Sequence, residues 1–113
     1  MKIKKERVYS RHTKEAAILL GKHIQWGRKE RHLSEMDLAD RAGISRLTLR
    51  KMEKGNPKCE LGLYFEVATI VGVILFGADS SRTLAAGIER MNDKLALLPK
   101  SIHKKKQDVD DAF

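Results

Sequence analysis

The 113-residue sequence has one cysteine, two prolines and few aromatic side chains, which make up 5% of the chain. A single cysteine cannot form an internal disulfide and offers no zinc cluster, so hydrophobic residues must hold the fold together. These residues make up 42% of the chain, which is enough for the core of one small domain. Because aromatics are scarce, we predict an aliphatic core. We expect neither a cofactor nor a metal site.

The sequence also lacks a secretory signal and a membrane span. The basic N-terminus, Met1 to Arg7, is not followed by an apolar segment. The longest apolar stretch, residues 61–78, contains one charge, Glu66, whereas a span needs about 20 apolar residues and a central acid is costly. We interpret this stretch as two short buried helices around a turn. We therefore expect a soluble bacterial protein of the cytoplasm, associated with the nucleoid and not with a membrane.

Motifs of catalysis are absent as well. The sequence has no His-Glu-x-x-His, no Gly-x-Ser-x-Gly and no glycine-rich phosphate loop. Its four histidines are scattered, at His12, His23, His32 and His103. Nothing in the sequence brings one of them to Cys59, which is expected to be a small, partly buried apolar residue. We therefore do not expect an enzyme.

Positive charge is what the sequence has in excess, and it is unevenly distributed. The chain carries 23 Lys and Arg against 15 Asp and Glu, a net charge of +8. Residues 1–58 hold 16 basic and 7 acidic side chains, residues 59–98 hold 3 and 5, and residues 99–113 hold 4 and 3. The N-terminal half therefore has the charge to meet a polyanion, although solubility alone would also account for it.

Helical periodicity and capping residues predict an all-α fold. After a basic arm at residues 1–12, a first helix is expected from an N-cap at Thr13 to about Arg31. Further helices are expected at residues 35–42, 46–54 and 60–71, with a short fifth helix around residues 73–76. The residues expected to face inward are Ala17, Leu20, Ile24, Gly27, Leu38, Ala39, Ala42, Leu49, Met52, Leu61, Tyr64, Phe65 and Ala68.

A further amphipathic helix is expected within residues 79–98. Its apolar residues recur at steps of four and three, which forms a heptad seam, and they are Leu84, Ile88, Met91, Leu95 and Leu98. This seam either forms a homodimer interface or packs onto the core of its own chain. Residues 99–113 follow as a flexible charged tail, which either docks a partner through Phe113 or only aids solubility.

Two short helices joined through Gly43 carry the functional prediction. Ser34 is placed to cap the first helix, with Asp37 in the capping-box position, and Ser45 is placed to cap the second. Gly43 can adopt the left-handed conformation that ends the first helix. This arrangement is a helix-turn-helix, in which the second helix enters the major groove of DNA.

The second helix of this pair has side chains suited to DNA. Arg and Lys bond guanine edges and Leu contacts the thymine methyl group, so we expect base reading by Arg46, Leu47, Arg50 and Lys51. Short hydroxyls at helix starts and a basic residue at the helix end suit phosphates, so we expect phosphate contacts from Ser34, Ser45, Thr48 and Lys54. Ser34 and Ser45 are caps first, and Thr48 is equally suited to packing.

A pattern of about a dozen positions over residues 33–55 resembles the Xre/Cro (lambda-repressor-like) helix-turn-helix family: Leu33-Ser34-x-x-x-Leu38-Ala39-x-x-Ala42-Gly43-Ile44-Ser45-x-x-Thr48-Leu49-x-x-Met52-Glu53-x-Gly55. The resemblance implies a five-helix domain at residues 13–78, a dimer on an inverted repeat of double-stranded DNA, and a structural ion pair between Arg28 and Glu53. Glu35 departs from the family, in which many members have glutamine there. A carboxylate cannot bond a phosphate, so this residue either accepts a bond from cytosine N4 or serves as a cap.

Shorter segments are similar to HipB-type antitoxins: Glu53-x-Gly55-Asn56-Pro57, Gly62-x-Tyr64-Phe65-x-Val67-Ala68, and Leu97-Leu98-Pro99-Lys100 before a basic stretch and an Asp-rich end. This resemblance implies an antitoxin that represses its own operon and inhibits a HipA-like serine/threonine kinase toxin. One alternative is a stand-alone, phage-type Xre regulator without a toxin partner. The other is a protein-binding module that uses the seam, Trp26 and the tail and does not touch DNA.

Overall fold

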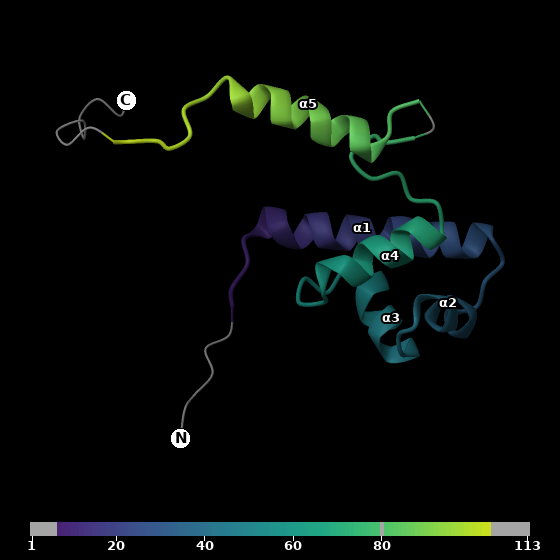
Figure 1. Cartoon of the computed structure of the whole chain (residues 1–113). Helices are drawn as coiled ribbons and strands as arrows, with labels where there is room; N and C mark the ends of the chain where they lie inside the picture. The colour runs from purple at the N-terminus through teal and green to yellow at the C-terminus, as the bar shows by residue number, and fades with distance from the viewer. Residues whose placement is uncertain (1–6, 80, 105–113) are drawn as a thin grey trace. The chain divides into compact units, whose positions relative to one another are not determined.

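The computed structural model describes residues 7–79 and 81–104, which fold into five α-helices with no strand among them (Figure 1). The helices are α1 (Arg11–Glu30), α2 (Glu35–Ala42), α3 (Arg46–Glu53), α4 (Leu61–Ile70) and α5 (Leu84–Ala96). The chain divides into two compact units, one up to Ile74 with α1 to α4, and one from Leu75 with α5. Half of the expected arm, residues 1–6, and most of the expected tail, residues 105–113, lie outside the described residues.

The first helix begins earlier than the sequence predicts. The N-cap of α1 is Ser10, whose Oγ accepts a hydrogen bond from the backbone N–H of Thr13 at 3.2 Å. The prediction that Thr13 is the cap was therefore wrong, because Thr13 supplies the N–H that a cap must satisfy. Two hydroxyl residues three positions apart both fit the capping rule, and only the backbone shows which one is used.

The short helix expected around residues 73–76 does not form. The chain reaches positive φ at Gly72 (76°), at Phe76 (55°) and at Gly77 (69°). Left-handed backbone at both ends of such a short segment leaves no room for a right-handed helical turn. The first unit therefore has four helices, not five, and it ends at Ile74 without a further helix after α4.

The core of the first unit is aliphatic, as the composition predicts. Helices α1 and α4 pack on each other, and α2 and α3 pack together against them. The buried hydrophobic residues are Ile24, Leu38, Ala39, Leu49, Met52, Tyr64, Val67, Ala68 and Val71. Leu61 was wrongly expected inside, since its side chain is 64% exposed. Helix α4 is apolar on nearly every side, so its periodicity does not reveal which face turns inward.

Two glycines bring α1 and the end of α3 into backbone contact. A Cβ atom added to Gly21 would lie 2.5 Å from the carbonyl oxygen of Met52, and one added to Gly55 would meet the backbone of Ile18. Since no side chain separates the two helices here, the end of α3 is held at a fixed position on α1. The residues after α3 are held as well, because the Tyr64 hydroxyl donates to the Asn56 carbonyl at 2.6 Å. Burial raises the pKa of Tyr64 to about 12, so this hydroxyl keeps its proton.

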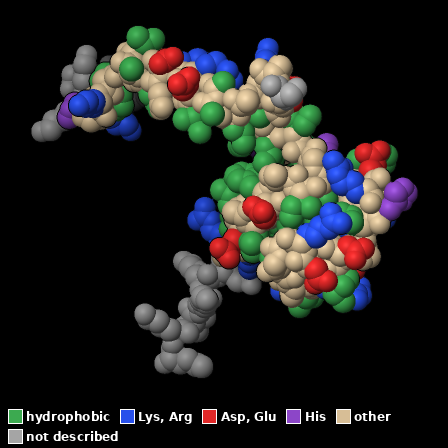
Figure 2. Space-filling model, turned by 45° about the vertical axis from the view of Figure 1, so that its right-hand side comes forward, with side chains coloured by type: hydrophobic (Ala, Val, Ile, Leu, Met, Phe, Trp, Pro, Cys, Tyr) green, Lys and Arg blue, Asp and Glu red, His purple; other side chains and the backbone are tan. Residues whose placement is uncertain are grey.

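The second unit consists of α5 and its flanking turns. Thr83 caps α5 by accepting a hydrogen bond from the N–H of Ala86 at 3.1 Å. No side chain of α5 is buried, and its apolar residues are visible as green patches on the helix in Figure 2. The five residues of the predicted seam, Leu84, Ile88, Met91, Leu95 and Leu98, are 51–63% exposed. Among the described residues, no helix is long and apolar enough to span a bilayer.

Candidate nucleic-acid interface

The connection between α2 and α3 is short and locally determined. Ser34 and Asp37 form a reciprocal capping box at the start of α2, with both hydrogen bonds at 3.0 Å. Gly43 ends α2 with φ of 71°, a conformation that costs glycine little. Ser45 then caps α3 by accepting from the N–H of Thr48 at 3.0 Å. Gly43 and the cap at Ser45 therefore fix the turn from which α3 projects.

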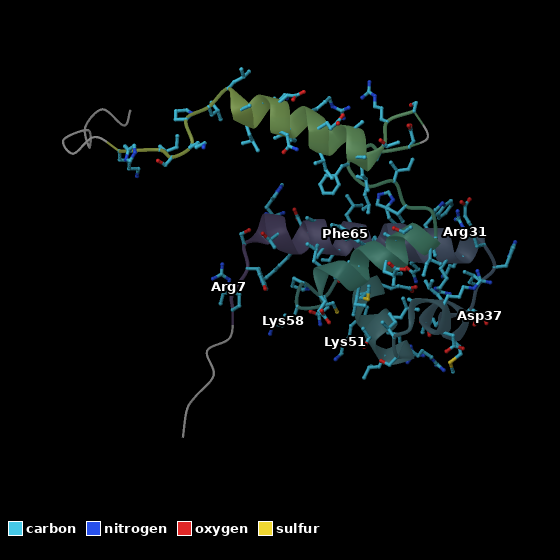
Figure 3. All side chains as sticks on the ribbon, viewed as in Figure 1. Arg7, Arg31, Asp37, Lys51, Lys58 and Phe65 are labelled. Carbon is cyan, nitrogen blue, oxygen red and sulfur yellow. The ribbon has the colours of Figure 1, made fainter. Side chains whose placement is uncertain are left out.

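Helix α3 has one buried side and one exposed side. Leu49 and Met52 are fully buried and Glu53 is buried beside them. The four residues predicted to read bases lie on the exposed side of the same helix, namely Arg46, Leu47, Arg50 and Lys51. Leu47 is 62% exposed, and Lys51 is exposed on α3 (Figure 3). The helix thus presents three cations and one leucine to solvent.

The four residues predicted to contact phosphate lie in different settings. Ser34 and Ser45 use their Oγ atoms as caps, and the Ser45 hydroxyl also donates to Thr48 Oγ1 at 2.9 Å. Thr48 is half-buried, so it takes part in packing as well as lying at the start of α3. Lys54 is exposed at the C-cap of α3. A basic side chain there faces the negative end of the helix dipole.

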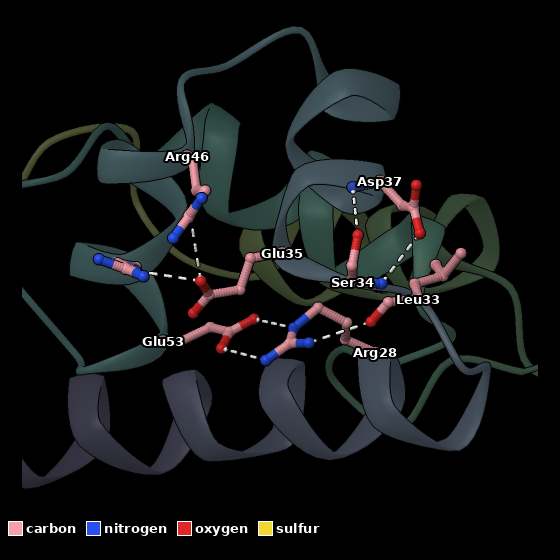
Figure 4. Close-up of polar contacts among 8 residues, drawn as sticks. Arg28, Leu33, Ser34, Glu35, Asp37, Arg46 and Glu53 are labelled. Carbon is pink, nitrogen blue, oxygen red and sulfur yellow. Dashed lines mark hydrogen bonds and ion pairs between the residues drawn. The ribbon is translucent and has the colours of Figure 1, made fainter.

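Arg28 and Glu53, the pair that the family resemblance implies, form a buried bidentate ion pair (Figure 4). Arg28 Nε donates to Glu53 Oε2 at 2.6 Å, and the terminal nitrogen Nη2 donates to Oε1 at 3.0 Å. Nη1 donates to the Leu33 carbonyl at 3.0 Å, which also ties in the segment before α2. The hydrogen bonds to Glu53 raise the pKa of Arg28. The pair joins α1 to the C-terminal end of α3.

The side chain of Glu35 occupies a position that the sequence did not reveal. Its Oε1 lies 3.0 Å from Arg50 Nε and 3.4 Å from Arg46 Nε (Figure 4). The hydrogen bond from Arg50 lowers the pKa of Glu35, so the carboxylate stays ionised. Glu35 therefore does not act as the capping carboxylate of α2, which is Asp37. The missed signal is an acid in the first turn of α2 and two arginines spaced i, i+4 on α3.

An open groove lies beside this cluster. It has a volume of about 410 Å³ and receives residues from α1, α2 and α3. Its polar lining includes Lys22 and Gln25, which sequence reasoning had not singled out, together with Glu35, Arg50, Glu53 and Lys54. On the face of the first unit turned to the viewer in Figure 2, basic and acidic side chains lie side by side. Glu35 thus offsets part of the positive charge that Arg46 and Arg50 bring to α3.

Among residues 7–79 and 81–104, no group of three His, Cys, Asp or Glu side chains is placed to hold a metal ion. No protein-family model, no curated protein and no solved structure matches the chain. The family resemblance described above therefore stands on the residues of the motif themselves.

Proposed function

We propose that the protein binds double-stranded DNA sequence-specifically through a helix-turn-helix formed by α2 and α3, with α3 as the recognition helix. The observation that carries this proposal is the division of α3 into a buried side and a cationic exposed side. A recognition helix needs this division, because one side must be held by the core while the other reaches base edges.

Each exposed residue of α3 has a role in this proposal. Arg46 and Arg50 bond guanine O6 and N7, Lys51 bonds guanine less rigidly, and Leu47 contacts a thymine methyl group. Lys54 and the helix starts at Ser34 and Ser45, with Thr48, contact phosphates. The local charge balance at Glu35 limits the sequence-independent part of binding, which favours a protein that reads bases.

Selection from a random duplex pool, followed by anisotropy titrations, tests the proposal. The wild type should enrich one site and bind it far more tightly than a scrambled duplex of equal length. Arg46→Ala should cost about 1–3 kcal/mol at one base position and relax the preference there. Lys54→Ala should reduce the salt slope without changing preference, whereas Lys94→Ala on α5, with the same charge loss, should change neither. Failure to enrich any site would refute sequence-specific binding.

We further propose that the protein acts as a homodimer through the seam on α5. The exposure of Leu84, Ile88, Met91, Leu95 and Leu98 supports this, because a helix with an apolar seam is stabilised when the seam is covered. A dimer would place two recognition helices roughly 34–36 Å apart on an inverted repeat. Sedimentation of Met91→Asp should show a monomer where the wild type sediments as a dimer. A dimer that survives this change would exclude the seam as its interface.

The biological role that fits best is a HipB-like antitoxin that represses its own operon and binds a HipA-like serine/threonine kinase toxin, without catalytic activity of its own. Its support is the resemblance of the segments around Gly55, Tyr64 and Leu98. A kinase reading frame beside the gene, and inhibition of that kinase by the purified protein, are the expected findings. A gene without such a neighbour favours the stand-alone phage-type regulator.

A further inference from the structure

We infer that Glu35 is a specificity-determining residue, which orients Arg46 and Arg50 and lowers their attraction for the DNA backbone. This inference rests on the proposed DNA-binding function. It concerns the ratio between binding to a preferred site and binding to any other duplex, not binding as such.

The geometry of the cluster allows orientation without blocking. In both contacts the guanidinium atom at the carboxylate is Nε, at 3.0 Å for Arg50 and 3.4 Å for Arg46. A guanidinium has five N–H donors, one on Nε and four on the two terminal nitrogens. Both arginine side chains remain 48–49% exposed. Because the contact to Glu35 is made at Nε, the two terminal nitrogens of each guanidinium can bond guanine O6 and N7 while Nε stays beside Glu35.

The charge of the cluster has the opposite effect on sequence-independent binding. Two guanidinium groups share one carboxylate, so the cluster presents one net positive charge instead of two. Binding to an arbitrary duplex depends almost entirely on neutralised phosphates and released counterions. Glu35 should therefore weaken binding to an arbitrary duplex. In a complex with the preferred site, both arginines keep the contact to Glu35 at Nε and bond bases through their terminal nitrogens. The ratio of the affinity for the preferred site to the affinity for any other duplex is thereby raised.

The variant Glu35→Gln tests the inference, since it keeps the size of the side chain and removes its charge. Glu66→Gln, at an exposed position in the middle of α4, is the control with the same change in net charge. The probes are a duplex selected from a random pool by the wild type and a scrambled duplex of the same length. Affinities are measured by anisotropy between 50 and 200 mM salt, after circular dichroism has verified folding.

Glu35→Gln should bind the scrambled duplex more tightly, with a salt slope steeper by about 0.9, which corresponds to roughly a threefold larger loss of affinity across this salt range. Affinity for the selected duplex should rise less or fall, so the ratio of the two affinities decreases. Glu66→Gln should leave slope and ratio unchanged. Glu35→Ala should reproduce the steeper slope and lose more of the selected-site affinity, because Arg50 Nε then lacks its acceptor and Arg46 lacks its ion-pair partner.

Three outcomes would overturn the inference. A slope and a ratio equal to those of Glu66→Gln would show that Glu35 does not shield the arginines. An equal weakening on both duplexes would show that it only supports the fold of the site. A wild-type protein that enriches no site at all would instead refute the proposed function, and the inference would fall with it.

Discussion

The buried ion pair between Arg28 and Glu53 makes the stability of the first unit depend on a single charge. We predict that Glu53→Gln, which preserves shape and removes the negative charge, strongly destabilises the protein. The guanidinium of Arg28 would remain buried with its bond to the Leu33 carbonyl but without a counter-ion. The two charge-assisted bonds to Glu53, at 2.6 and 3.0 Å, would be replaced by weaker contacts to an amide.

The expected magnitude follows from this geometry. Removing one partner of a buried ion pair costs about 3–5 kcal/mol, and the amide oxygen of glutamine still accepts one bond, so the lower end applies. For a domain of this size, about 3 kcal/mol corresponds to a fall in Tm of roughly 12–24 °C. The double variant with methionine at positions 28 and 53 should recover most of the loss, because well-packed apolar residues often replace buried ion pairs without penalty.

Urea unfolding followed by circular dichroism at 222 nm measures these free energies of unfolding. Glu66→Gln on the surface of α4 is the control and should stay within about 0.5 kcal/mol of the wild type. A loss below about 1 kcal/mol for Glu53→Gln would refute the reasoning, since that is the range of exposed, solvent-screened pairs.

Three further predictions concern single contacts. Gly21→Ala should lower the stability of the protein by about 1–3 kcal/mol, because its Cβ would meet a backbone carbonyl of α3 at 2.5 Å. Gly62→Ala, with open space around the added atom, should not destabilise the protein. Thermal unfolding of the two variants makes the comparison. The hydrogen bond from the N-cap backbone N–H of α2 lowers the pKa of Asp37. The stabilisation that Asp37 gives is therefore present above its unfolded pKa and is lost as pH falls through the lower folded pKa. The difference in stability between the wild type and Asp37→Asn should shrink in acid, and a constant difference would contradict this. The carboxyl carbon of Glu35, followed by NMR, should titrate below the usual range, and Arg50→Ala should raise that pKa toward it.

Features set by neighbouring residues were predictable from the sequence. Ser34 determines where α2 begins, and Gly43 and Ser45 determine where α2 ends and α3 begins, because each acts on backbone groups within three or four residues. The same local rules failed where two answers fit equally well. Ser10 and Thr13 both satisfied the rule for an N-cap, and the apolar run at residues 73–76 had no periodicity that distinguished a turn from a helix.

Contacts between distant positions could not be predicted in this way. Glu35 meets Arg46 and Arg50 only because α2 and α3 cross at an angle that packing sets. On α4, Tyr64 and Ala68 are buried as expected. The burial of Val67 and the exposure of Leu61 were missed, because a helix that is apolar on nearly every side does not show which residues its neighbours cover. The Arg28–Glu53 pair spans 25 positions and was expected from the family resemblance, not from spacing.

The backbone contacts at Gly21 and Gly55 have a consequence for how this protein can change. They hold α3 at its C-terminal end, whereas Arg46, Leu47 and Lys51 are exposed to solvent. Replacing the exposed residues would leave the backbone contacts between α1 and the end of α3 unchanged. Under the proposed DNA-binding function, a few exchanges among these exposed residues would change the preferred site while the packing of α3 stays the same.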